Sequence, residues 1–372
     1  MWNLLNVVQV LAFMRFYTRW PALMAQILLW MENAVTMKPV SDKVFDFGKD
    51  KFERANQTLS DESLLEAGIT DPNLFRGLGV FSIVLVLGLL GVAIYVLLSA
   101  MTRGHCRWLK TPRDFIHRKL FYNGFLRYLI VSNLKLTITA WAFFIYQYSD
   151  GVQIKAAGFF VGIIALLIYP VLFMYFLLKN QDSLEEPKTR QKYSSVYDGI
   201  YTESKQALLY NTVFCLRRFY IVLVNTVFNV SCPFTDFEQS RYFYKIILFL
   251  LIQSVYLLYV ESARPHTLEL FNRLEVFNES ALMLLAYIMI AFSGIVEGQV
   301  AGNDLAELLA FAVTVSILIG NFSVLFNRTI WKVKLMLKKR ELQKQATLRR
   351  ETMLAMRKTN RVENEPTDDL PT

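Results

Sequence analysis

The sequence predicts an all-α protein, a polytopic helical membrane bundle with about eight transmembrane helices and both termini in the cytoplasm. Hydrophobic residues make up 54% of the 372-residue chain and charged residues only 19%, whereas soluble domains average about 45–50% and about 25%. The apolar residues are also gathered into runs of about 20 residues without net charge, long enough to cross roughly 30 Å of hydrocarbon. These two observations exclude a soluble enzyme, a disordered chain and a collagen-like fibre.

The first segment, residues 1–37, is apolar but is interrupted by Arg15, Arg19 and Pro21. We expect either one tilted helix kinked at the proline or an interfacial helix followed by a short span. A proline is tolerated inside a membrane helix where neighbouring groups satisfy the freed carbonyl. The cleanest span of the sequence follows at residues 77–101.

Charge in the connecting segments predicts the orientation. Residues 38–76 carry six basic and eight acidic side chains, whereas residues 102–119 carry six basic and one acidic side chain. Because Lys and Arg concentrate on the cytoplasmic side, residues 38–76 are predicted to form an outer extramembrane loop and residues 102–119 an inner one. Within a bundle over residues 77–327, the other predicted spans are 120–148, 156–178, 207–230, 242–262, 280–299 and 304–327. The predicted outer connections are 149–155, 231–241 and 300–303, and the predicted inner ones are 179–206 and 263–279.

The C-terminal segment predicts a basic cytoplasmic helix over residues 328–358 and a disordered acidic tail over residues 359–372. Twelve basic and two acidic residues lie between Arg328 and Arg361. Such a helix could lie on anionic inner-leaflet lipid, at about 1 kcal/mol per basic residue, bind a calmodulin-like partner, or stay solvated. The positive charge adjoins the apolar spans, so we expect membrane lipid as a partner and no nucleic acid.

Ionisable residues inside spans are the best pointers to function, because each costs several kcal/mol unless it is paired or hydrated. Arg217 and Arg218 lie near mid-membrane in the span 207–230. Adjacent helix positions diverge by about 100°, so the two arginines need partners on two faces. Glu275 and Glu279, four residues apart on one helix face, are the candidate partners. This buried charge cluster could line a conduction or gating pathway, or it could be a structural ion-pair network.

A second group lies in the span 120–148. Arg127 and Lys135 are eight residues apart and roughly aligned, and Asn133 lies between them. They predict an intramembrane polar face, since about 12 Å of rise is too little for both charges to reach opposite interfaces.

A third group gathers where the last two spans reach the outside. Glu297, Asp304 and Glu307 predict an outer acidic mouth, which would concentrate cations if several subunits surrounded it. The alternative is a solvated loop between two helices. Of the five Asn-x-Ser/Thr sequons, only Asn56 lies in a predicted outer loop clear of the membrane, and it is the expected glycosylation site.

The inventory of catalytic motifs is poor. His105, His117 and His266 fall in predicted inner loops without metal-ligand spacing. The chain has no glycine-rich phosphate loop, nucleophile elbow or His-Glu-x-x-His helix. We therefore expect no enzyme, no metal site and no cofactor.

Several strings carry a resemblance that keeps its order over about 330 residues. They are MWNLLNVVQVLAF with WPALMAQILLW, then LFYNGFLRYLI, then KYSSVYDGIYTESKQALLYNTVFCLRRFYIVLV, and last RPHTLELFNRLEVFNESALMLLAYIMIAFS. They resemble blocks of the large ciliate multi-pass membrane proteins of the transient-receptor-potential-like type, whose more distant relatives are fungal channels of that type and the polycystins. The resemblance marks Trp2, Asn6, Gln9, Arg127, Tyr193, Tyr197, Gly199, Asn211, Arg217, Arg218, Asn272, Glu275, Asn278 and Glu279.

The resemblance implies a helical membrane domain with cation-channel ancestry. The usual members carry a large Cys-rich ectodomain before this domain, and they place a carboxylate after the arginine that corresponds to Arg127, where this chain has Ser132, Asn133 and Lys135. We expect a cation-channel or channel-derived subunit that forms a homo-oligomer or joins a larger membrane complex. The alternative is a non-conducting membrane scaffold or anchor. The plasma or ciliary membrane is expected in preference to an internal one.

Overall fold

The computed structural model describes residues 2–36, 80–103, 113, 116, 125–149, 169–230, 238–293 and 300–363. Within these ranges the chain is helical apart from turns, and its one β-type pairing is an isolated bridge between Ile200 and His266. The all-α class is therefore confirmed for the described residues. The chain divides into two compact units, Met1–Leu318 and Ile319–Thr372, which we describe separately.

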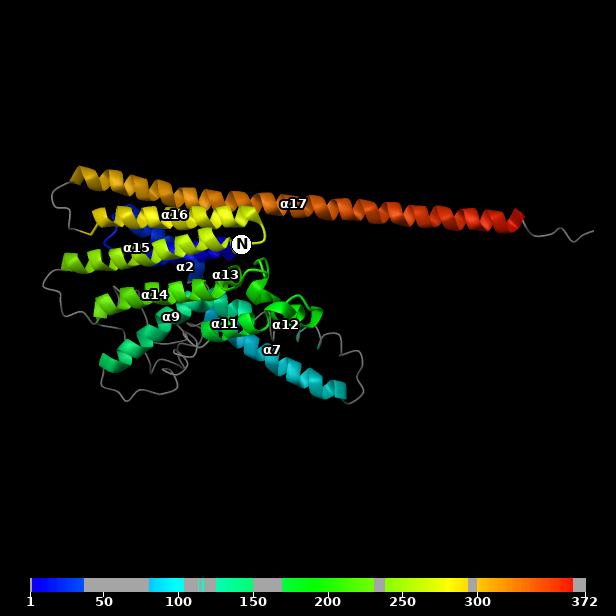
Figure 1. The fold of residues 1–372 in the computed structure, drawn as a ribbon, viewed down its shortest axis with the longest axis horizontal. Coiled ribbons are helices and arrows are strands. Elements are labelled where there is room, and N and C mark those ends of the chain that lie inside the picture. Colours follow the sequence, from blue (N-terminus) through cyan, green and yellow to red (C-terminus); the bar gives the residue numbers. More distant parts are fainter. Residues whose placement is uncertain are drawn as a thin grey trace, which may run out of the picture. The chain divides into compact units, whose positions relative to one another are not determined.

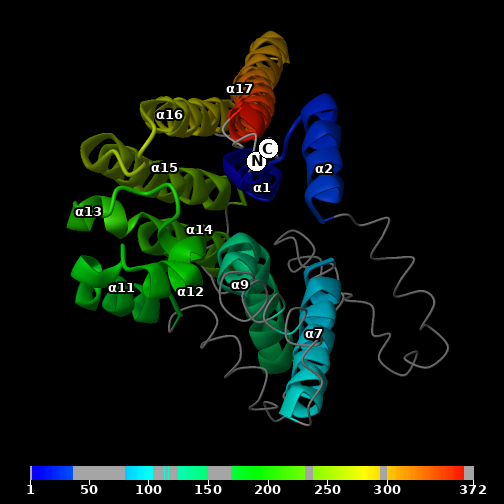
Figure 2. The ribbon, with the colours of Figure 1, turned by 90° about the vertical axis from the view of Figure 1, so that its right-hand side faces the viewer.

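The first unit contains eleven described α-helices. They are α1 (Trp2–Met14), α2 (Ala22–Thr36), α7 (Val80–Arg103), α9 (Phe125–Ser149), α11 (Tyr169–Lys179), α12 (Pro187–Tyr197), α13 (Lys205–Leu208), α14 (Tyr210–Val230), α15 (Glu238–Ala263), α16 (Glu269–Ala291) and the first part of α17 (Val300–Glu363). All of them except α7 contribute residues to the apolar clusters of this unit. Within the described residues, α7 contributes no buried side chain. Helices α14, α15 and α16 lie side by side in chain order, and α9 packs against α14 (Figures 1 and 2).

Helix α1 is an interior element. It packs against α9 and α16, and Leu11, Phe13 and Met14 on it are almost completely buried in the main apolar cluster. Its 13 residues rise only about 20 Å, less than the hydrocarbon thickness. Burial inside the bundle, rather than contact with lipid on all sides, explains its apolar sequence.

The N-terminal segment forms two helices where the sequence allowed one kinked helix. The backbone leaves the helical path after Met14, and the indole of Trp20 donates to the Met14 carbonyl at 3.1 Å. Helix α2 then starts directly after Pro21, where the missing N–H costs nothing, and Ala25 donates to the Pro21 carbonyl at 2.9 Å. The other expectation, an interfacial helix followed by a short span, stays a prediction.

Among the described residues, three helices are long and apolar enough to cross a membrane: Arg241–Ala263, Glu269–Ala291 and Asp304–Met353. Shorter apolar helices lie at Leu4–Met14, Val86–Met101 and Pro170–Lys179. The described residues are thus compatible with a membrane location. They contain three candidate spans, whereas the sequence predicted eight.

Helix α16 begins eleven residues before the predicted span 280–299, so the predicted inner connection over 263–279 shrinks to a short loop. The side chain of Asn272 binds the backbone just ahead of this helix. Its Nδ2 donates to the His266 carbonyl at 3.0 Å, and its Oδ1 accepts from the His266 N–H at 2.8 Å. Backbone groups ahead of the helix are thereby satisfied without a longer loop.

The predicted inner segment 179–206 is also helical in large part, since it holds α12 and α13. In the second unit, residues 319–363 form one uninterrupted helix, so the predicted boundaries at 328 and 359 do not appear as breaks. No Gly or Pro occurs between residues 321 and 363 to end the helix. Trp331, Leu342 and Met353 are exposed on this helix.

Candidate functional site: a buried charge centre

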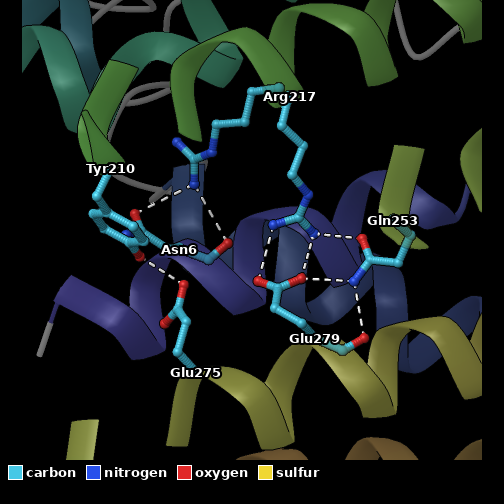
Figure 3. Close-up of polar contacts among 7 residues, drawn as sticks. Asn6, Tyr210, Arg217, Gln253, Glu275 and Glu279 are labelled. Carbon is cyan, nitrogen blue, oxygen red and sulfur yellow. Dashed lines mark hydrogen bonds and ion pairs between the residues drawn. The ribbon is translucent and has the colours of Figure 1, made fainter. Parts of the chain in front are cut away.

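The centre of the bundle holds an ion pair between α14 and α16. Arg217 donates from Nη1 to Glu279 Oε1 at 2.9 Å, and its Nη2 lies 2.6 Å from Glu279 Oε2. Both side chains are only 3% exposed. The two parallel contacts form the bidentate arrangement in which a guanidinium binds a carboxylate most strongly (Figure 3).

Gln253 of α15 closes this pair into a three-helix clamp, which we define as Arg217, Gln253 and Glu279. The Gln253 carbonyl oxygen accepts from Arg217 Nη2 at 2.7 Å. Its amide donates to Glu279 Oε2 at 2.6 Å and to the Glu279 backbone carbonyl at 2.8 Å. The Arg217 guanidinium also lies 4.2 Å from the ring centroid of Tyr256, a cation–π contact. The clamp therefore joins α14, α15 and α16 through fully buried polar groups.

Glu275 serves a different partner, although it lies only one helical turn before Glu279. Its Oε1 accepts a 2.6 Å hydrogen bond from the hydroxyl of Tyr210, the first residue of α14. The predicted carboxylate pair is thus divided between an arginine and a tyrosine, as Figure 3 shows.

Arg218 points toward α1 and contacts Asn6 on that helix. Its Nη2 donates to the side-chain oxygen of Asn6 at 3.3 Å and to the Asn6 backbone carbonyl at 3.4 Å. The guanidinium lies 4.2 Å from the ring centroid of Phe214. The two arginines therefore have partners on two faces of α14, as expected. The partners of Arg218 are the side-chain amide and the backbone carbonyl of Asn6 in the N-terminal helix.

Helix α1 and the turn after it are held by four further hydrogen bonds, each donated by a side chain to a distant backbone carbonyl. Each joins residues more than a hundred positions apart in the sequence. They are Gln9 to the Val131 carbonyl at 3.3 Å, Tyr17 to the Ile221 carbonyl at 2.6 Å, Thr18 to the Phe292 carbonyl at 3.1 Å, and Lys245 to the Phe16 carbonyl at 3.2 Å.

Next to the Tyr210–Glu275 contact, two loops pair with each other. Tyr201 N–H donates to the Pro265 carbonyl at 2.8 Å, and Thr267 N–H donates to the Gly199 carbonyl at 3.0 Å. Gly199 has a φ of 82° and Arg264 a φ of 40°, a region that costs L-residues about 1–2 kcal/mol. The His266 ring lies edge-on to Tyr210, with centroids 5.0 Å apart. Burial lowers the pKa of His266 to about 4, so this ring is neutral at neutral pH.

The predicted polar face on α9 is divided. Asn133 is completely buried and Lys135 half-buried. Arg127, by contrast, is 45% exposed and lies 3.9 Å from Asp198, which follows α12. Arg127 therefore does not belong to a buried intramembrane face, because it sits in the first turn of α9, at the level of a loop.

The outer acidic mouth stays a prediction, and the structure describes two of its three residues. Asp304 is exposed on α17, whereas Glu307 accepts a 3.3 Å hydrogen bond from the backbone N–H of Met24 in α2. Glu297 and the glycosylation candidate Asn56 lie outside the described residues. Among those residues, no group of three or more His, Cys, Asp and Glu side chains could hold a metal ion.

Sequence reasoning missed Gln253, Tyr210 and Lys245. Lys245 is buried to 1% exposure, and its Nζ lies 4.6 Å from the Tyr242 ring centroid. Both Gln253 and Lys245 lie inside a predicted span, so the same cost argument that singled out the arginines would have found them. Tyr210 offers no such signal, because tyrosines are common near membrane boundaries.

The centre brings together a neutralised acid–base pair, a tyrosine–carboxylate contact and an arginine held by the N-terminal helix. Such groups fix helix positions and respond to any change of charge nearby. Comparison of the chain with protein-family models, with curated proteins and with solved structures finds no match in any of the three.

Proposed function

We propose that the chain is a multi-pass integral membrane protein of the transient-receptor-potential-like type, a cation-channel or channel-derived subunit. The observation that carries the proposal is the clamp of Arg217, Gln253 and Glu279. Charged side chains at the depth of apolar helices are rare, and they mark ion pathways, relays and gating elements. A clamp across three neighbouring helices ties the relative position of those helices to the charge state of one pair.

The proposed orientation has eight spans with both termini in the cytoplasm. This topology also assigns a direction to α1. Asn6, early in α1, contacts Arg218 in the first half of α14. Thr18, just after α1, contacts Phe292 at the end of α16. In the charge-based topology Arg218 lies near mid-membrane and Phe292 lies toward the outside, so within that topology α1 runs outward.

An ion path in this protein would lie between copies. Both terminal nitrogens of Arg217 and both carboxylate oxygens of Glu279 are engaged within one chain, so the clamp does not line an open passage. The proposal therefore includes a homo-oligomer or a larger membrane complex. Membrane lipid is the other proposed partner, with anionic inner-leaflet lipid at the basic segment that begins at Arg328.

The second candidate function is a non-conducting membrane scaffold or anchor. The same closed clamp favours it, because a pair that satisfies itself serves packing as well as gating. Breaking the clamp should change a cation current if the protein is a channel subunit. It should change only the stability of the fold if the protein is a scaffold.

The test is to purify the full chain, reconstitute it in planar bilayers and record cation currents. The channel proposal expects currents that change in open probability when Glu279→Gln removes the charge from the clamp. Arg273→Gln is the matched control, since Arg273 lies on the same helix, is 78% exposed and pairs only loosely with Glu269 at 3.5 Å. A folded, oligomeric and electrically silent protein would replace the channel proposal with the scaffold.

A further inference from the structure

Helix α2 has one buried and one exposed apolar face. Met24, Leu28 and Met31, spaced as i, i+4 and i+7, are almost completely buried in the main core. On the opposite side, Leu23 is 52% and Trp30 71% exposed. The seven-residue spacing places these two side chains above each other on one helix face.

The exposed face carries no charge. Gln26 and Ala34 are the other exposed residues at its spacing of three, seven and eleven from Leu23. The one charged residue of α2, Glu32, lies 3.0 Å from Arg15 in an ion pair beside α1. The only charged side chain of α2 therefore lies on the side toward the bundle. The outward side consists of apolar side chains, the indole of Trp30 and the neutral amide of Gln26.

Helix α2 crosses the bundle direction at one end of the helices. In Figure 2 it is seen from the side, whereas α1 is foreshortened. Its first turn lies at Glu307, early in α17. The preceding turn contacts Phe292, where α16 ends: Thr18 donates to its carbonyl, and the Trp20 ring centroid lies 5.6 Å from that of Phe292. A helix that crosses spanning helices at their ends lies along the membrane surface, and its 15 residues are too short to span.

From these observations we propose that α2 is an interfacial helix, with its Leu23–Trp30 face in the boundary between headgroups and acyl chains of one leaflet. This inference rests on the proposed membrane function. Trp settles at that level because its ring is apolar and its N–H is polar, and an uncharged apolar face is what the acyl boundary accepts.

A second copy of this chain fits the face less well. One side of a 15-residue helix offers only a few hundred Å², well below the roughly 800 Å² per partner of a stable interface. The face also lacks the charged groups that fix the register of two proteins.

The test uses the full chain in phosphatidylcholine vesicles with Trp30 as the sole tryptophan, the other five being replaced by Phe. Lipids brominated near the headgroup should quench Trp30 fluorescence by about twofold or more over lipids brominated near the chain end, because Trp sits at the headgroup level. A chain with Trp20 alone is the matched control. Trp20 is half-buried against Phe292, and its quenching should be weaker at every bromine depth.

The same measurement on the unaltered chain and on Trp30→Phe guards against a sole-tryptophan variant that fails to fold. Quenching by shallow bromine should fall in Trp30→Phe and stay unchanged in Trp20→Phe. Quenching of Trp30 by aqueous iodide without bromolipid quenching overturns the proposal in favour of a water-facing helix. Protection from both quenchers overturns it in favour of a protein partner. A chain that fails to float with the vesicles contradicts the proposed membrane function itself, before any quenching is read.

Discussion

At the scale of single residues, the clamp pairs two charges that are each costly to bury alone. Arg217→Met leaves the Glu279 carboxylate buried beside Gln253 without its cation. We expect it to lower the free energy of unfolding by about 3–5 kcal/mol, measured by denaturation in detergent micelles. The double variant R217M/E279L removes both charges and should recover most of the loss. Arg273→Gln, at an exposed pair, should cost no more than about 0.5 kcal/mol. Equal stability of the single and double variants would contradict an ion pair that holds the fold.

A second prediction concerns one glycine in the paired loops. Gly199 has a φ of 82°, and nothing lies within 4 Å of the Cβ that alanine would add. Gly199→Ala should therefore destabilise only through its backbone conformation, by about 1–2 kcal/mol, measured as a lower Tm. Gly88 in α7 also has open space around it but has helical geometry. Gly88→Ala should raise stability by about 0.5–1 kcal/mol. A fall in both variants would mean that lost space, not backbone conformation, decides the effect.

The scale of helices shows where sequence reasoning succeeds. The partner of Arg217 could be predicted because a guanidinium buried in an apolar helix requires an acid, and the acids at Glu275 and Glu279 lay on one face of a later helix. The partner of Arg218 could not. Its contacts come from Asn6, and neither hydropathy nor charge indicates that a short apolar segment will enter a bundle instead of crossing beside it.

The boundaries of α16 show a second limit at this scale. A hydropathy window rejects residues 269–279 because they contain four charged side chains. In the fold, Glu275 and Glu279 are buried against partners and Glu269 and Arg273 are exposed. A helix can begin there because tertiary contacts neutralise what the window counts as a cost. For Arg127 the prediction fails in the opposite direction. Its place in a predicted span indicated burial, whereas its side chain is exposed and lies near Asp198 in a loop.

The loop between α15 and α16 should make stability depend on pH. Burial lowers the pKa of His266 from 6.5 to about 4, so between these values the unfolded chain binds more protons than the folded one. Stability from this residue is then complete above pH 6.5 and is lost as the pH falls toward 4, by up to about 3 kcal/mol. His266→Gln should flatten the curve of unfolding free energy against pH over this range, whereas Arg264→Gln should leave its shape unchanged. An unaltered slope in His266→Gln would show that other groups carry the dependence.

At the scale of the whole molecule, the charge balance of the connecting segments predicts the orientation. Residues 38–76, in which acidic side chains outnumber basic ones, should face outside, and the basic C-terminal segment should face the cytoplasm. Expression in a eukaryotic membrane system tests both sides at once. Asn56 should be glycosylated, so that Asn56→Gln abolishes a glycosidase-sensitive mobility shift. Asn327→Gln is the matched control, since its sequon adjoins the basic segment on the predicted inner side, and it should not change the mobility shift.

A C-terminal epitope tag should bind antibody only after the cells are permeabilised. Binding to intact cells together with an unglycosylated Asn56 would invert the topology, and the interfacial face of α2 would then belong to the inner leaflet.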